Sequence, residues 1–294
     1  MPDVDRCHAG RVRSHHLILR PGTPVMAREP GVLQIGLHDP LLRVRDEPAA
    51  RELLQRLNQP GVVRPAPVGQ PTADRLLARL DAVGLLVAVP DDERTTDRAL
   101  DALRAQFGRD APRRHDTHAG ARIAVQASEE DGALLTGLLD QAGLRRTTLT
   151  DPAADVHLVV TRGSVDRERL DPLIRDSAPH LVLSGGAAGR RIGPFVAPGR
   201  TACLRCVDAH EALHDARLPL LLCQAARTAA ERPPPADPLL DQIAFAWAVR
   251  DLCRYVEGDE PSTWSTTVDL DARGLARQSR WGRHPDCGCA WDVI

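Results

Sequence analysis

Short apolar runs and helical periodicities alternate with turn residues over the first part of the chain. The strand-like runs Val32–Leu37 and Leu41–Val44 flank a His-Asp-Pro turn, a pattern that predicts a β-hairpin. Apolar residues then recur at helical spacing in Ala49–Leu57 and in Thr72–Val83, and Leu85–Val89 is typical of a closing strand. Strands followed by helices in so short a segment predict a small winged-helix-like domain over residues 1–90.

The pattern changes after a charged segment at residues 91–120. Arg94–Phe107 is predicted to form a helix, and Gly108–Gly120 (GRDAPRRHDTHAG) is predicted to be a linker. Residues 121–294 then alternate strand-like runs with helical periodicities, which indicates an α/β domain with βαβ units and a parallel sheet. Its predicted elements are the strands Ala121–Gln126, Val156–Thr161, His180–Leu183 and Trp264–Leu270 and the helices Gly132–Ala142, Asp166–Ser177 and Pro238–Cys253.

Composition excludes several classes of function. All 38 basic residues are arginine, so the chain offers no lysine for a Schiff base or for a phosphate-binding loop. A formal net charge of -2 argues against a general nucleic-acid-binding protein. No apolar run reaches the ~20 residues that span a bilayer, and the N-terminus lacks the apolar core of a signal peptide. We therefore expect a cytoplasmic protein that binds neither nucleic acid nor membrane.

Four of the seven cysteines lie in two close pairs, Cys203 with Cys206 in CLRC and Cys287 with Cys289 in CGC. Two such pairs supply the four thiolates of a tetrahedral zinc site. A redox-active CxxC normally opens a helix after the first strand of a thioredoxin-like unit, whereas this one follows a Pro-Gly turn late in the chain. We predict a structural zinc ion. Buried, inert thiols are expected for Cys7, Cys223 and Cys253.

The turn after the first predicted strand of the α/β domain does not match a nucleotide-binding loop. Several glycines normally let backbone N–H groups hold phosphates at a helix N-terminus. Ala127–Ala133 (ASEEDGA) instead contains one glycine and three acids, which suit a helix N-terminus but repel a phosphate. Gly185 and Gly186, in SGGAAG, are predicted to form a hairpin. We therefore expect no bound ATP.

The segment Ile192–His210 (IGPFVAPGRTACLRCVDAH) resembles the ThiF-like proteins of ribosomal peptide natural-product clusters. These are also called ocin-ThiF or cyclodehydratase partner proteins. Their pattern is Gly-Pro, an apolar strand, Pro-Gly-x-Thr-x-Cys-x-x-Cys, and then a helix with Asp and His. His284–Trp291 (HPDCGCAW) is similar to the second zinc half of the family, and the resemblance covers about residues 25–294.

The resemblance implies a fold related to the adenylating enzymes that activate ubiquitin-like proteins, with a structural zinc ion on four cysteines. It also implies an N-terminal winged-helix domain that binds the leader of a precursor peptide. The partner would be a YcaO-type enzyme that performs the ATP-dependent heterocyclisation, forming azolines, or related backbone chemistry. Adenylating enzymes hold their nucleotide with a glycine-rich loop, an arginine and a lysine, whereas this chain has ASEEDGA and no lysine. We therefore expect a non-catalytic adaptor, for which a homodimer is one possible assembly.

A leader peptide is expected to add as a strand beside an edge strand and to lie against a helix. The edge candidate is Leu41–Arg45 and the helix is Thr72–Val83; Arg75 and Arg79 would reach acidic leader residues. Charges on an edge strand also serve to protect it from pairing, which is the alternative explanation. The candidate peptide-binding residues are Leu41, Leu42, Arg43, Val44, Arg45, Arg75, Leu76, Arg79 and Leu80, among which Leu76 and Leu80 are also expected in the core.

Two other functions stay open from the sequence. An ATP-dependent adenylating enzyme that acts on a peptide or carrier-protein carboxylate would need a nucleotide site despite ASEEDGA. A winged-helix DNA-binding regulator would need a basic recognition helix, which the balanced charge does not favour.

Overall fold

The computed structural model describes residues 15–59, 71–90 and 97–289. The chain divides into two compact units, with the boundary between His115 and Asp116. Cys7 and Trp291 lie outside the described residues. Within the described ranges, no helix is long and apolar enough to cross a membrane.

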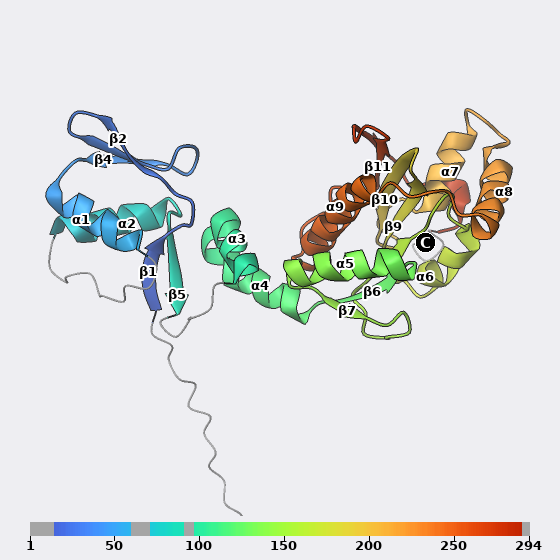
Figure 1. The fold of residues 1–294 in the computed structure, drawn as a ribbon, viewed down its shortest axis with the longest axis horizontal. Coiled ribbons are helices and arrows are strands. Elements are labelled where there is room, and N and C mark those ends of the chain that lie inside the picture. Colours follow the sequence, from blue (N-terminus) through green and yellow to red (C-terminus); the bar gives the residue numbers. More distant parts are fainter. Residues whose placement is uncertain (1–14, 60–70, 91–96, 290–294) are drawn as a thin grey trace, which may run out of the picture. The chain divides into compact units, whose positions relative to one another are not determined.

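Up to residue 90, the described part of the first unit contains a three-stranded antiparallel sheet of order β2-β3-β4 and the two helices α1 and α2 (Figure 1). Leu33 of β3 lies opposite Val44 of β4, and a separate antiparallel pair joins β1 to β5. The predicted hairpin, both predicted helices and the closing strand are confirmed, whereas β2 was not predicted. The elements are β1 (His15–Leu19), β2 (Val25–Glu29), β3 (Val32–Ile35), β4 (Leu42–Arg45), α1 (Pro48–Leu57), α2 (Pro71–Ala82) and β5 (Leu86–Pro90).

The segment predicted to be a linker is helical. After α3 (Arg98–Phe107), Gly108 turns the chain at φ 58°, and a short 3-10 turn leads into α4 (Ala111–Gly120). The prediction of a loop was wrong because the buried positions of α4 include Arg114 and His118, so the helix shows little apolar periodicity. The Arg114 guanidinium stacks 3.9 Å from the Phe107 ring. This contact covers a charged group at a position where an amphipathic helix usually has an apolar side chain.

The second unit is built on a seven-stranded sheet of order β12-β11-β10-β9-β8-β6-β7. The strands β6, β8 and β9 run parallel, as predicted. Strand β7, which was not predicted, also pairs parallel with β6, and β10, β11 and β12 continue the sheet antiparallel. SGGAAG forms the predicted hairpin, in which Gly185 has φ 102°. The strands are β6 (Arg122–Gln126), β7 (Arg145–Thr147), β8 (Val156–Val160), β9 (His180–Gly186), β10 (Gly189–Val196), β11 (Thr266–Asp271) and β12 (Ala276–Arg280).

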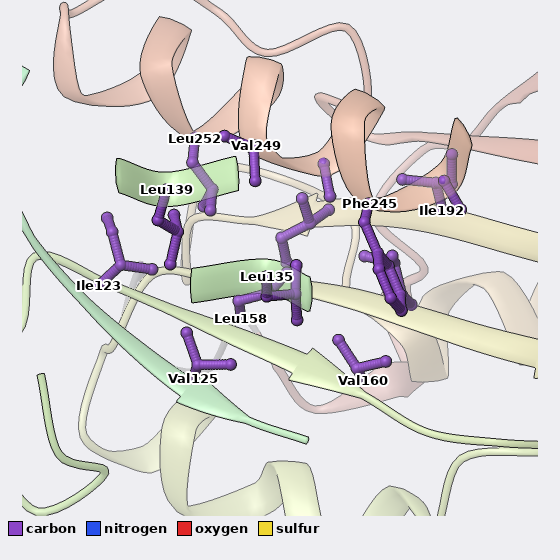
Figure 2. Close-up of a cluster of buried hydrophobic side chains, with 14 of the residues drawn as sticks. Ile123, Val125, Leu135, Leu139, Leu158, Val160, Ile192, Phe245, Val249 and Leu252 are labelled. Carbon is purple, nitrogen blue, oxygen red and sulfur yellow. The ribbon is translucent and has the colours of Figure 1, made fainter. Parts of the chain in front are cut away.

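Two long helices, α5 (Glu129–Ala142) and α9 (Pro238–Val256), supply one side of the main core of this unit. Figure 2 shows Leu135 and Leu139 of α5 and Phe245 of α9 directed into one cluster with side chains of the strands. A smaller cluster joins β8 and β9 to the segments that carry α6 and α7. The remaining helices are the 3-10 turn η2 (Arg167–Leu170), α6 (Asp171–Arg175), α7 (Leu204–Ala212), α8 (Leu218–Glu231), which was not predicted, and the 3-10 turn η3 (Pro285–Cys287).

Candidate functional site

The two cysteine pairs, far apart in sequence, meet in one cluster. Their four sulfur atoms all lie within 4.8 Å of one another. Cys203 Sγ is 3.8 Å from Cys206 Sγ and 3.3 Å from Cys287 Sγ, and Cys206 Sγ is 3.5 Å from Cys289 Sγ. Four sulfurs bonded tetrahedrally to one zinc ion lie about 3.8 Å apart. The cluster therefore fits a metal ion of that size and coordination.

Local backbone geometry aims each pair of thiols at the same point. Cys203 is the N-cap of α7, so Cys206 follows one helical turn later on the same side. On the other arm, Gly288 has φ 76° between Cys287 and Cys289, a conformation that favours glycine and reverses the chain. Both pairs of thiols thus point toward the centre of the cluster from short turns. The sequence spacing of the cysteines was sufficient to predict that the two pairs meet.

Hydrogen bonds link the four thiols of the cluster. Cys203 donates a hydrogen bond to Cys206 Sγ, and the backbone N–H of His284 donates another over 3.3 Å. These contacts hold the pKa of the Cys206 thiol far below its usual range, while the same bond raises the pKa of Cys203. A bound zinc ion would displace the protons of the thiols, and four thiolates around it would leave no position for water. The donor set suits a structural metal rather than a catalytic one.

The predicted peptide edge, β4, is an outer strand of the sheet in the described part of the first unit. The N–H of Asp46 donates to Gly31 O across the β3–β4 hairpin, over 2.9 Å. Because strand residues alternate, the backbone groups of Leu42 and Val44 face β3, and those of Arg43 face outward. The edge therefore offers main-chain groups to an added strand.

Side chains along this edge divide between core and solvent. Val44 of β4, and Leu76 and Leu80 of α2, are at most 7 % exposed and pack in the core of the first unit. These three residues are unavailable to a peptide in this structure, although they support the surface that it would contact. Leu41 and Leu42 are half-buried. The exposed members of the predicted set are Arg43, Arg45, Arg75 and Arg79.

Helix α2 reaches the β4 edge through one contact that the sequence does not indicate. Arg79 Nη2 donates to the outward carbonyl of Arg43 over 3.0 Å. Arg75, one turn earlier, donates to Pro71 O within its own helix over 2.9 Å. The structure thus brings Arg43 and Arg79 together and leaves the guanidinium groups of Arg75 and Arg45 away from that contact.

A cavity of about 510 Å³ lies at the carboxyl ends of β6 and β8, bordered by α8. Asp131, in the first turn of α5, is 1 % exposed and accepts a hydrogen bond from Arg162 Nη2 over 2.7 Å. Ser128 caps the same helix by accepting the N–H of Asp131. Dinucleotide-binding sheets bind phosphate at the positive N-terminal end of the equivalent helix. In this chain the carboxylate of Asp131 already occupies the N-terminal end of α5. Sequence patterns missed this cavity because α8 was not predicted.

No protein-family model matches this chain. No curated protein matches it either. Among solved structures, the heterocyclase TruD matches with a TM-score of 0.68 at 17% identity over 94% of this chain and 43% of TruD. A heterocyclase in complex with substrate and cofactor matches with a TM-score of 0.69 at 16% identity, over 94% of this chain and 40% of that chain. E. coli MccB, solved with AMPCPP and MccA, matches with a TM-score of 0.60 at 13% identity, over 93% of this chain and 99% of MccB.

The chain shares the fold of the matched part of TruD and of MccB. It spans less than half the length of the two heterocyclase chains and almost the whole length of MccB. At these identities the likeness concerns the fold, and the expectation of a ThiF-like architecture agrees with it.

Proposed function

We propose that this protein is an adaptor that captures the leader of a ribosomally made precursor peptide and presents the peptide to a YcaO-type heterocyclase. The observation that carries the proposal is the β4 edge, where outward main-chain groups lie beside α2. An extended leader would add to the sheet as the next strand after β4. Residues 1–90 would form the binding unit, a winged-helix-like recognition domain.

The proposal includes a YcaO-type partner, as the resemblance implies. TruD and the substrate-bound heterocyclase each extend over more than twice the matched region. In our proposal, a YcaO-type chain carries out azoline formation or a related backbone modification. This chain would supply recognition and no catalytic residue.

We assign the four-cysteine cluster a structural zinc ion. Its closed set of four thiolates supports a role in folding of the second unit. The ion would hold the start of α7 against the segment around η3 and would take no part in ring formation.

The alternative, an ATP-dependent adenylating enzyme, is less well supported. Asp131 and two further acids occupy the first turn of α5, and Arg162 is engaged by Asp131 instead of standing free for a phosphate. Titration calorimetry with ATP and Mg²⁺ tests the point. Micromolar affinity would favour the adenylating enzyme over the adaptor.

Fluorescence polarisation tests the adaptor directly. The probe is the fluorescein-labelled leader of a precursor peptide, which the proposal expects to be encoded beside this chain's gene. Arg43→Pro removes an outward N–H from the edge, and prolines are tolerated on edge strands, whereas Arg43→Ala keeps that N–H. We expect Arg43→Pro to bind about tenfold more weakly than Arg43→Ala, the scale of one lost main-chain hydrogen bond. Equal affinities for the two variants would contradict strand addition at β4.

A further inference from the structure

Four exposed arginines surround the β4 edge without a carboxylate partner. In the described part of the first unit, Arg43, Arg45, Arg75 and Arg79 form no ion pair. Of the acids nearby, Asp46 is engaged by Arg51, and Asp74 lies exposed in the first turn of α2. The charge beside the edge is therefore predominantly positive and available to a ligand.

The four arginines would meet an added strand from both sides. Arg43 and Arg45 project from β4 on the face opposite the buried Val44. Arg75 and Arg79 belong to α2, whose Leu76 and Leu80 pack in the same core as Val44. Because side chains of an added strand alternate between the two faces, carboxylates on either face would meet guanidinium groups.

Arg79 also occupies the group that an added strand needs. Its Nη2 donates to Arg43 O, and that carbonyl is the outward acceptor for the N–H of a neighbouring strand. Arg79 therefore competes with an added strand for this carbonyl. A carboxylate is the stronger acceptor for guanidinium, because it carries a full negative charge and can accept two parallel N–H bonds, whereas a carbonyl oxygen carries only a partial charge.

We propose that Arg79 is the residue that determines specificity at the β4 edge, closing it to neutral strands and opening it to an acidic extended peptide. The inference rests on the proposed leader-binding function and names the chemistry of the leader: a strand with carboxylates at alternate positions. On binding, Arg79 exchanges the Arg43 carbonyl for a ligand carboxylate, and the ligand's main-chain N–H takes the carbonyl.

Two short fluorescein-labelled peptides serve as probes, one alternating valine with glutamate and its match alternating valine with glutamine. We expect the unmodified protein to bind the glutamate peptide about tenfold more tightly, as the sum of several exposed ion pairs. Arg79→Ala should weaken binding of the glutamate peptide and strengthen binding of the glutamine peptide, because the carbonyl is then free. Arg75→Ala is the matched control: it removes a charge from the same helix without freeing the edge, so the glutamine peptide should gain nothing.

The gain for the glutamine peptide in Arg79→Ala is the decisive signal, and Arg79→Gln provides a second variant that removes the charge but keeps a polar side chain. If the peptides bind but Arg79→Ala changes neither affinity, Arg79 does not guard the edge, and the adaptor function survives. If neither these peptides nor the leader binds any variant, the adaptor function fails and the inference fails with it.

Discussion

His180 is a buried imidazole in the second unit. It is 1 % exposed, and its Nδ1 lies 2.9 Å from Ala178 O. Burial lowers the pKa of His180 to about 4, against the opposing effect of the Ala178 hydrogen bond and with a further lowering by His157. The unfolded chain, in which histidine titrates near pH 6.5, therefore takes up this proton at a higher pH than the folded protein does.

Because folding lowers this pKa, the contribution of His180 to stability is complete above about pH 6.5 and is lost as the pH falls towards about 4. The loss is about 1.4 kcal/mol per pH unit within that window. We expect urea unfolding to show a smaller loss between pH 7 and pH 5 for His180→Asn, which keeps an N–H for Ala178 O. Equal losses in both proteins would contradict a neutral buried His180.

The cysteine cluster yields a second prediction for single residues. Cys206→Ser removes one of the four ligands and should leave purified protein with substoichiometric zinc and a lower melting temperature. Cys223→Ser is the matched control, because Cys223 lies outside the cluster and is exposed, which corrects the expectation that this thiol is buried. Elemental analysis of the two variants distinguishes them. Full zinc content in Cys206→Ser would exclude this metal site.

Among the elements, α9 shows how one buried carboxylate fixes a loop. Asp251 is 1 % exposed and accepts hydrogen bonds from the N–H and Oγ of Ser262 at 2.8 and 3.1 Å. It also accepts from the N–H and Oγ1 of Thr263 at 2.9 and 2.5 Å. The loop between α9 and β11 is therefore attached to the helix by four donors.

Asp251→Ala would leave these donors unpaired, so we expect a loss of about 3 kcal/mol in the free energy of unfolding. Asp251→Asn keeps the size and part of the accepting capacity, so its loss should be smaller. Urea unfolding followed by tryptophan fluorescence measures both. If Asp251→Ala lowers the free energy of unfolding by less than an ordinary surface substitution does, ~0.5 kcal/mol, contacts other than those of Asp251 hold the loop.

Elements could be predicted from sequence where burial follows a simple period. Leu76 and Leu80 repeat at helical spacing and are both buried, so α2 was predicted. Helix α4 was not, since Arg114 and His118 occupy its buried positions. The cysteine pairs were predictable because a metal requires adjacent thiols. The Arg79–Arg43 contact was not, because it joins residues 36 positions apart and depends on how α2 packs beside β4.

At the scale of the whole molecule, the two units can be observed separately. All four tryptophans and the single tyrosine lie after residue 116, so intrinsic fluorescence reports on the second unit alone. The proposed peptide-binding edge, in contrast, lies in the first unit. The two units therefore have independent optical signals, tryptophan emission and probe polarisation.

Removal of zinc by a chelator should unfold the second unit and shift its tryptophan emission, because the metal would hold α7 to the η3 segment. Polarisation of the labelled leader should persist under the same conditions, and readdition of zinc should restore the emission. Simultaneous loss of both signals at the same chelator concentration would contradict independent units.

The cysteine cluster joins parts of the chain that the ribosome makes at different times. Cys203 and Cys287 lie 84 positions apart, yet their sulfurs are 3.3 Å apart. A nascent chain that has just completed α7 holds only two of the four thiols, while its first unit is already synthesised. Under the proposed function, such a nascent chain can capture a leader before its metal site exists. Zinc supply would then govern maturation of the second unit without limiting capture by the first.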